Sequence, residues 1–437
     1  MDLGQPVTPQ SARAIVAGME RTAADLARWA ESGAMALPGP ADGAPCAAPA
    51  SVATAAHAAA ADLATQTARW GRRVEIDGPA LLGERAAITH MARNGSVSVG
   101  GSARFVQAAD GWFALNLPRP EDVAALPALV SREVAPNDWA SNEAGLRAMR
   151  RSDVVAQATL LGMAVGAPGT DAPPASPGRE LARGAARRPT PNPLVVDLTS
   201  LWAGPLAASL LRLSGARVVK VEGRSRPDGA RAGAVAFYDL VNTGKECVDI
   251  DLQDLADVGL LHRLIAAADL VIEGSRPRVM DELGIHPAEI VRSGTSWLSI
   301  TAHGRTGAAA DRVGFGDDAA VSGGLLVAGA PPMFVADAVA DPLAGLVAAV
   351  YGADLLAGDR AAAVEVPLAR VAAWAAGPSC VAVGRRDGEA WTVDVDGESV
   401  PVAAPWHRPI PPAAPPVGAH GASLRAEFAP RRGSSPG

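Results

Sequence analysis

Short apolar runs alternate with longer amphipathic stretches over residues 194–300 of the chain. Residues 194–200, LVVDLTS, form a short β-branched run that ends in polar residues, which is typical of a buried strand. The next stretch, AGPLAASLLRLSGA, predicts a helix with Gly215 as its stop signal, and RVVKVEG predicts a second strand. Farther on, LLHRLIAAA predicts a helix leading into the strand of DLVIEGSRP, and SWLSITAHG predicts another strand. Elements that alternate in this way predict a parallel sheet with right-handed crossovers, and hence an α/β fold.

The carboxyl ends of these strands are the places where ligands of such sheets bind. Candidate binding residues are therefore expected at four segments, residues 199–205, 222–231, 273–276 and 302–305.

The part of the chain before this region carries weaker periodicity. Residues 11–31 and the stretch HAAAADLATQTARW predict helices, and residues 142–161 are mostly helical. The stretch SARFVQAADGWFALNL predicts two strands joined by a turn at Asp110 and Gly111. A smaller α+β domain is expected here.

One change in composition divides the chain. Residues 166–193 are rich in Pro, Gly and Ala and show neither helical nor strand period, so they predict a linker. The organisation expected from these patterns is a first unit, the linker, an α/β domain and a closing segment with a loose tail. Their bounds are residues 1–165, 166–193, 194–390 and 391–437.

The two parts of the chain resemble each other in short stretches. SGAMALPG near Ser32 is similar to SGGLLVAG near Ser322, and RRVEIDGPALLGERAA is similar to AAAVEVPLARVAAWAA farther along each part. Two matches in the same order predict a partial internal duplication. The first copy has APASVATAAH where the second has ADAVADPLAG, so only the second copy offers an acid there.

Composition and charge exclude several classes of protein. Of the 437 residues 49% are hydrophobic, and 39 basic residues stand against 46 acidic ones, a net charge of −7, which argues against a nucleic-acid binder. Cys46, Cys247 and Cys380 are far apart without metal-ligand spacing, so neither a metal site nor a disulfide framework is expected. No signal pattern or uncharged membrane-spanning run is visible, and we expect a cytoplasmic protein that does not bind membranes.

Known nucleotide motifs are missing from the first strand–helix turn, since TSLWAGPLAAS contains neither GxGxxG nor a P-loop. The chain instead carries KVEGRSRPDGAR, VNTGKECVDIDL, VIEGSRPRVMDELGI and GRTG in this order. In order and spacing these motifs resemble the class III CoA-transferases of the CaiB/BaiF type, a family that includes formyl-CoA transferase and α-methylacyl-CoA racemase. The resemblance runs from Val195 to about Ala376 and implies a Rossmann-like parallel sheet with a smaller α+β domain.

The resemblance implies coenzyme A chemistry without a permanently bound cofactor. The substrates would be an acyl-CoA as donor and a carboxylic acid as acceptor. The family holds the CoA nucleotide at the first strand–helix turn and at basic residues after the next strands, although each arginine could equally be a solvated loop charge. Carried over by position, the binding residues are Leu201, Trp202 and Ala203 on the adenine side, Arg224, Arg226 and Lys245 near the phosphates, and Gly274, Ser275 and Arg276 beside the pantetheine.

The family nucleophile is an aspartate about four residues before a glycine, at the start of a helix of small apolar residues. Asp341 matches this position, with Gly345 four residues later, and Asp337 is the second candidate, which could instead start a helix or form an ion pair. The resemblance implies that the carboxylate attacks the thioester and then carries CoA as an aspartyl thioester. An apolar pocket would protect these intermediates from water and would raise the pKa of the carboxylate.

Two other activities stay open. The racemase branch needs a His-Asp pair just after a glycine, and this chain has Phe315 and Gly316 in those places, so proton exchange lacks a partner unless Asp317 or Asp318 comes into range. The incomplete first copy also leaves open a CoA-binding pseudoenzyme subunit. His303 stands where the family often has an aromatic ring and is interpreted as part of the wall.

Family members form dimers in which two chains thread through each other, with the small domain of one chain near the nucleophile of the other. Here the segment that resembles the small domain precedes the α/β domain in the same chain. Its Gly100 and Gly101 are candidates for the glycine-rich loop that covers the nucleophile, with a plain β-turn as the alternative. We expect either a pseudo-dimeric monomer, favoured by the covalent attachment of the two halves, or a homodimer.

Overall fold

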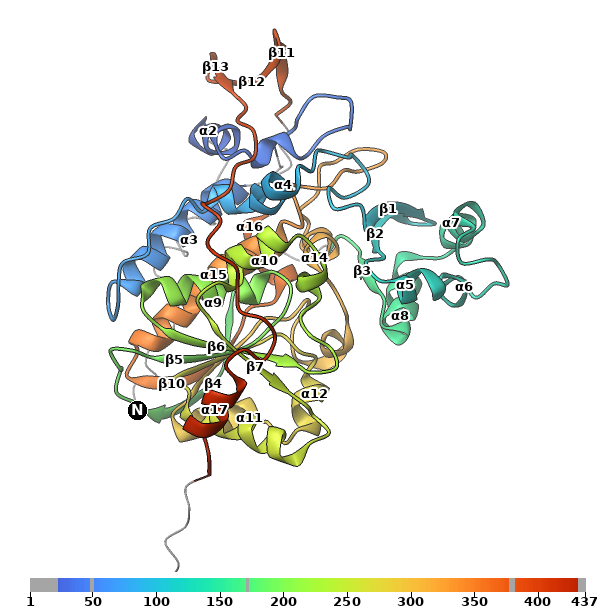
Figure 1. Ribbon diagram of the computed structural model, residues 1–437. Coiled ribbons are helices and arrows are strands. Elements are labelled where there is room, and N and C mark those ends of the chain that lie inside the picture. The colour runs from blue at the N-terminus through green and yellow to red at the C-terminus, as the bar shows by residue number, and fades with distance from the viewer. Residues whose placement is uncertain (1–22, 48–50, 170–172, 377–381, 431–437) are drawn as a thin grey trace, which may run out of the picture.

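A seven-stranded sheet forms the centre of the molecule (Figure 1), in a computed structural model that describes residues 23–47, 51–169, 173–376 and 382–430. The strand order is β4-β10-β9-β8-β5-β6-β7. Neighbouring strands from β5 to β10 run parallel, and β4 pairs antiparallel with β10 at one edge. The predicted α/β fold with a parallel sheet is therefore confirmed. The strands are β4 Arg179–Ala186, β5 Leu194–Leu198, β6 Arg217–Gly223, β7 Glu246–Ile250, β8 Leu270–Glu273, β9 Ser296–Ser299 and β10 Arg360–Glu365.

The sheet is doubly wound around β5. The chain first moves outward from β5 to β6 and β7, and it then returns to the other side of β5 for β8, β9 and β10. The carboxyl ends of β5 and β8 are therefore separated by the crevice in which ligands of such sheets bind.

Helices cover the sheet because its strands are apolar on both faces; every residue of β8 and β9 is buried. The longest helix, α15, packs against α9, which ends at Gly215 as predicted. By length and composition α15 is the one described helix that could cross a bilayer, but 83% of it is buried inside the protein, as in a core helix. The α-helices between β5 and the closing segment are α9 Ala203–Ser214, α10 Val235–Asn242, α11 Leu255–Ala267, α12 Pro277–Glu282, α13 Pro287–Ile290, α14 Gly316–Ser322, α15 Ala340–Ala357 and α16 Leu368–Ala375.

The helices near the N-terminus belong to the same core as the sheet. α2 (Ala23–Glu31), α3 (Val52–Thr67) and α4 (Glu84–Thr89) bury side chains in one hydrophobic cluster with α9 and α15, and α3 packs directly on α15. Only residues 23–31 of the helix expected over 11–31 can be assessed, since residues 11–22 lie outside the described part of the chain.

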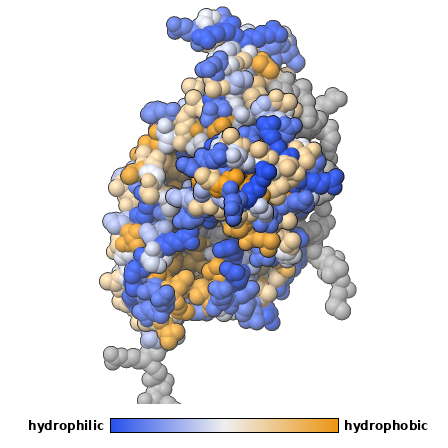
Figure 2. Space-filling view, turned by 90° about the vertical axis from the view of Figure 1, so that its right-hand side faces the viewer, coloured by the Kyte–Doolittle hydropathy of each residue, from blue (hydrophilic) through white to orange (hydrophobic). Residues whose placement is uncertain are grey.

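A smaller α+β unit, residues 103–166, projects from this core (Figure 1) and has a hydrophobic cluster of its own. The predicted hairpin is present, with its turn at Ala109 and Asp110, one residue before the expected Asp110 and Gly111. The helix expected over residues 142–161 is two helices with a break between them. Hydrophilic and hydrophobic residues are interspersed on the face that carries this unit (Figure 2). The elements are β1 Ala103–Ala108, β2 Gly111–Asn116, α5 Pro120–Ala124, α6 Leu126–Leu129, α7 Trp139–Ala148, α8 Arg151–Leu161 and β3 Ala164–Gly166.

The expected linker over residues 166–193 is wrong for its central part, because β4 lies within it and extends the main sheet. An edge strand has one hydrogen-bonded neighbour and an exposed outer side, so its backbone can pair without the apolar pattern of an inner strand. β4 could therefore not be recognised in a segment whose Pro- and Gly-rich composition predicted a linker.

The closing segment follows a long path over the surface (Figure 1). A three-stranded hairpin sheet contacts α2, and an extended stretch then returns to the main sheet, where α17 packs beside β7. These elements are β11 Arg385–Asp387, β12 Ala390–Val395, β13 Glu398–Pro401 and α17 Gly421–Glu427.

Candidate active site

A cavity of about 320 Å³ lies where β5 ends, between the sheet domain and residues of the first part of the chain. Three groups line it: the turn after β5 with the loop before α10, the starts of α14 and α15, and residues 85–118. Its lining residues are Arg85, Thr89, Met91, Ser102, Asn116, Pro118, Leu201, Trp202, Ala230, Gly233, Ala234, Phe237, Phe315, Asp317, Ala338 and Asp341.

Two carboxylates face this cavity. Asp341, the second residue of α15, accepts a hydrogen bond from the backbone N–H of Gly316 at 3.1 Å. Burial raises the pKa of Asp341 from about 3.8 to about 7, although the nearby Arg85 acts in the opposite direction. Asp317 accepts a hydrogen bond from the backbone N–H of Ala338 at 3.2 Å. Burial, reinforced by the negative charge of Asp337, raises the pKa of Asp317 to about 7. Both groups therefore change protonation state near neutral pH.

The second candidate nucleophile, Asp337, is held in a buried ion pair. Its side chain is 0% exposed and does not line the cavity. The guanidinium of Arg85 donates to both of its oxygens, at 2.9 and 2.5 Å, and lies over the ring of Trp202 at 4.6 Å. This geometry is that of an ion-pair residue, the alternative role that the sequence had left open for Asp337.

A third acid, Asp318, joins the small unit to α14. The amide nitrogen of Asn116, at the end of β2, donates to Asp318 at 2.8 Å, and the same carboxylate accepts from the backbone N–H of Phe315. Burial raises the pKa of Asp318 to about 6. Asn116 also lines the cavity, so this contact fixes one wall of the site.

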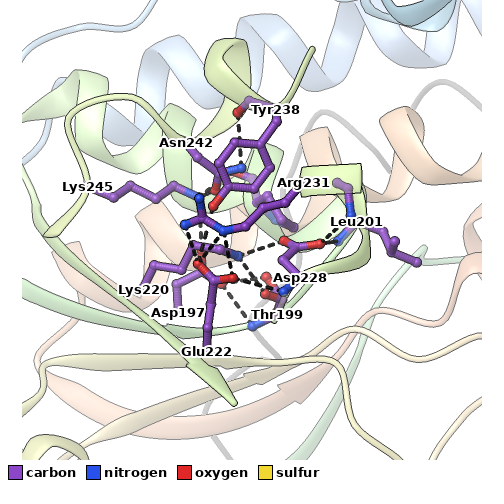
Figure 3. Close-up of polar contacts among 12 residues, drawn as sticks. Asp197, Thr199, Leu201, Lys220, Glu222, Asp228, Arg231, Tyr238, Asn242 and Lys245 are labelled. Atoms are coloured by element: carbon purple, nitrogen blue, oxygen red, sulfur yellow. Dashed lines mark hydrogen bonds and ion pairs between the residues drawn. The ribbon is translucent and has the colours of Figure 1, made fainter. Parts of the chain in front are cut away.

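A buried ionic network supports the turn after β5 (Figure 3). Lys220 donates to the carboxylate of Asp228 and to the carbonyl of Thr199, both at 2.9 Å. Asp228 in turn accepts from the backbone N–H of Leu201 at 2.9 Å. Leu201 has φ = 70°, a left-handed conformation that side chains other than glycine rarely adopt, so this bond stabilises a strained turn. Leu201 and Trp202, both predicted from the sequence, are thereby positioned at the cavity.

Lys245 and Arg224, the two cations expected near the CoA phosphates, both form ion pairs with carboxylates. Lys245 is buried and donates to Asp197 at 2.8 Å, and burial lowers its pKa to about 8 despite the attraction of Asp197. Arg224 contacts Asp249 at 2.7 Å and Asp257 at 2.8 Å. Both cations thus pair with carboxylates in this structure, and their expected phosphate contacts stay a prediction.

The remaining predicted binding residues lie outside the cavity lining. Ala203 is buried as the first residue of α9. Arg226 is exposed in the loop after β6, and no side-chain hydrogen bond or ion pair of this residue is found in the described part of the chain. Gly274 and Arg276 are exposed and Ser275 is half-buried, in the loop between β8 and α12. The binding roles expected of these residues stay predictions.

Several lining residues were missed by sequence reasoning. Arg85, Ser102 and Asn116 come from the first part of the chain, where no catalytic motif was recognised. The one signal was a lone arginine in the stretch ALLGERAA. Ser102 lies directly after Gly101, so the proposed glycine loop does reach the cavity wall. His303 does not line the cavity, and burial lowers its pKa to about 3, so the ring is neutral.

Together, the fold and the cavity define a doubly wound α/β protein with buried carboxylates at the ligand-binding end of its sheet. Residues 193–405, just under half of the chain, match the profile of CoA-transferase family III. The family predicted from the motifs is thereby confirmed.

Characterised relatives support the same class. A succinyl-CoA–D-citramalate CoA-transferase of Chloroflexus aurantiacus is 29% identical over 37% of this chain and 44% of its own length. The alpha subunit of a succinyl-CoA–L-malate CoA-transferase from the same organism is 33% identical over 41% of this chain and 45% of its own length. The chain thus spans less than half the length of these relatives. A crystal structure of a hypothetical protein (Rv3272) from Mycobacterium tuberculosis is 30% identical, with a TM-score of 0.38 over 41% of this chain and 55% of that chain, too low to support an argument.

Proposed function

We propose that the protein transfers CoA from an acyl-CoA to a carboxylic acid, with Asp341 as the nucleophile. The observation that carries this proposal is the contrast between the two acids of the stretch ADAVAD. Asp341 faces the cavity at the carboxyl end of the sheet, whereas Asp337 is fully buried against Arg85.

The proposed reaction needs only the carboxylate of Asp341. A carboxylate oxygen attacks the thioester carbonyl, the C–S bond breaks, and CoA leaves as a thiolate, so a mixed anhydride remains. The thiolate then attacks the aspartyl carbonyl and releases the first acid, which gives an aspartyl-CoA thioester. The acceptor carboxylate repeats these steps in reverse, and the aspartate is regenerated without a net proton change.

The surroundings of Asp341 suit this chemistry. A carboxylate with a pKa near 7 is more basic than an exposed one, and about half of it is ionised at neutral pH. Apolar side chains such as Phe237 and Phe315 limit water beside the intermediates. The Arg85 guanidinium supplies positive charge near the oxyanion that forms on the thioester carbonyl.

Isotope exchange tests the proposal without knowledge of the natural acceptor. The protein is incubated with an acyl-CoA and the same acid in labelled form, and label in the thioester is measured. Asp341→Asn should abolish exchange, and hydroxylamine should trap the aspartyl thioester at Asp341. If exchange survives in Asp341→Asn but is lost in a folded Asp337→Asn variant, the nucleophile is Asp337 and the proposed assignment is wrong. Binding of CoA without any exchange would favour the pseudoenzyme.

A second candidate function is epimerisation at the α-carbon of an acyl-CoA. Asp317 and Asp341 face one cavity, and each has a pKa raised to about 7. Two such carboxylates could remove and return a proton on opposite faces of the carbon. In deuterium oxide an epimerase would incorporate deuterium at the α-carbon of 2-methylacyl-CoA, whereas a transferase would leave it unlabelled.

We also propose that one chain completes this site alone, as a pseudo-dimeric monomer. The two expected copies, in which α3 and α4 would correspond to α15 and α16, contact each other reciprocally. Cys46, before α3, forms a β-bridge with Val383, after α16. In the same way the backbone N–H of Phe334, before α15, donates to the carbonyl of Gly95, after α4, at 3.1 Å. Such reciprocal contacts are those of a two-fold pair. Sedimentation should give one species near 44.2 kDa, and a species of twice this mass would contradict the monomer.

A further inference from the structure

The walls of the cavity divide by origin. The sheet domain supplies the turn after β5 and the loop before α10, which by our proposal receive the pantetheine end of CoA. The opposite wall comes from the first part of the chain and, by the same proposal, faces the group that extends beyond the thioester carbonyl. The residues of this wall are Arg85, Thr89, Met91, Ser102, Asn116 and Pro118.

Carboxylates outnumber cations in and beside the cavity. Arg85 is the single Lys, Arg or His side chain that lines the cavity among the described residues. Its guanidinium already pairs with both oxygens of Asp337 and lies near Asp317 and Asp341. An acyl group with a free carboxylate would bring a fourth acid to one cation. A buried carboxylate without a partner costs several kcal/mol, so the site disfavours such a group.

Apart from Arg85 and the two aspartates, the side chains that line the cavity are apolar or neutral. Met91, Pro118 and Phe315 offer apolar surface. The neutral polar groups are the hydroxyls of Thr89 and Ser102 and the amide of Asn116, whose nitrogen already donates to Asp318. The cavity volume of about 320 Å³ lies at the lower end for small-molecule sites and must also hold the thiol end of CoA. Space therefore limits the length of the acyl chain.

From the charge and the volume together we infer that the acyl group is short and uncharged, so that the substrate is a monocarboxylic rather than a dicarboxylic acid. This inference rests on the proposed CoA transfer. Specificity then depends on the first part of the chain, which lacks a nucleophile but forms the wall beyond the thioester.

Butyryl-CoA, succinyl-CoA and palmitoyl-CoA test this inference, since the first two have four-carbon acyl groups and differ in one carboxylate. The exchange of each thioester with its own labelled acid is measured at pH 7.5 on the full chain. The expected kcat/KM is on the order of 100-fold higher for butyryl-CoA than for succinyl-CoA. Equal or faster exchange with succinyl-CoA overturns the inference and leaves the transferase standing, as does a preference for palmitoyl-CoA. No exchange with any thioester overturns the proposed function and the inference with it.

A variant that adds a charge tests whether the wall from the first part of the chain determines specificity. Met91→Arg adds a cation there and should move the ratio of butyryl-CoA to succinyl-CoA at least about tenfold towards succinyl-CoA. Leu255→Arg is the matched control, because Leu255 is 87% exposed on α11 outside the cavity lining, and it should leave both rates unchanged. A folded Met91→Arg protein with the original ratio contradicts the assignment of this wall. The ratio of the unaltered protein decides the substrate class even if Met91→Arg does not fold.

Discussion

Replacing Asp341 by asparagine is expected to abolish exchange and, at alkaline pH, to stabilise the fold. The pKa of Asp341 is raised from about 3.8 to about 7 in the folded chain, mainly by burial. Between these values the folded state keeps a proton that the unfolded chain has released. The contribution of this proton to stability is therefore complete below about pH 4 and is lost as the pH rises through about 7.

The magnitude follows from the size of this pKa change. Each pH unit between the folded and unfolded pKa corresponds to about 1.36 kcal/mol. Between pH 5 and the folded pKa of about 7 lie about two pH units, so the unaltered protein loses about 3 kcal/mol of stability between pH 5 and pH 8. The free energy of unfolding of Asp341→Asn relative to that of the unaltered protein should therefore increase by the same amount. Asparagine has no proton to lose and keeps an oxygen that can accept the bond from Gly316.

Denaturant unfolding at pH 5 and pH 8 measures this difference. Asp387→Asn serves as the control, because Asp387 is exposed on β11, and its relative stability should be the same at both pH values. A relative stability of Asp341→Asn that does not change with pH, or that falls at pH 8, would refute the assignment of a raised pKa to this carboxylate.

Further substitutions test the charges around the site. Arg85→Met leaves Asp337 without its partner and should lower the free energy of unfolding by about 3 kcal/mol, with partial recovery in the double variant with Asp337→Leu. The same Arg85 change should move the acid limb of the exchange rate to higher pH, because Arg85 lowers the pKa of Asp341. Lys245→Met should lower the free energy of unfolding by a similar amount and change KM for acyl-CoA less than twofold. A large increase in KM without a loss of stability would instead indicate that Lys245 binds a CoA phosphate. Arg226→Ala should raise KM about fivefold at unchanged kcat if this exposed arginine binds a CoA phosphate, and an unchanged KM would remove it from the site.

The central sheet could be predicted from the sequence because its signals are local. Strands buried on both faces appear as continuous apolar runs, and a glycine in the left-handed conformation marks the end of α9. The linker prediction failed where this logic does not hold. β4 depends on hydrogen bonds to β10, a strand that lies far along the chain, and not on a pattern in its own side chains.

The candidate site could be predicted only in part, because ion pairs join residues that are distant in sequence. Asp341 follows from its local motif, although its assignment as nucleophile stays a prediction. The partner of Asp337, Arg85, lies 252 residues away, and no pattern along the chain connects them. Lys245 stands in a family motif, but a motif does not reveal that Asp197, 48 residues earlier, neutralises it. Charge balance in three dimensions was the missing information.

The position of β4 gives the connection between the two parts of the chain a protective role. Without β4 the sheet would end at β10, of which five of six residues are buried and mostly Ala and Val. A bare apolar edge of this kind invites pairing with another molecule and aggregation. β4 covers it with an alternation of exposed and half-buried residues, among them the exposed Arg179 and Arg183. β4 thus prevents the sheet from pairing with a second molecule. A longer or cleaved connection would uncover the edge of β10 and allow the protein to associate, even if both parts of the chain stayed folded.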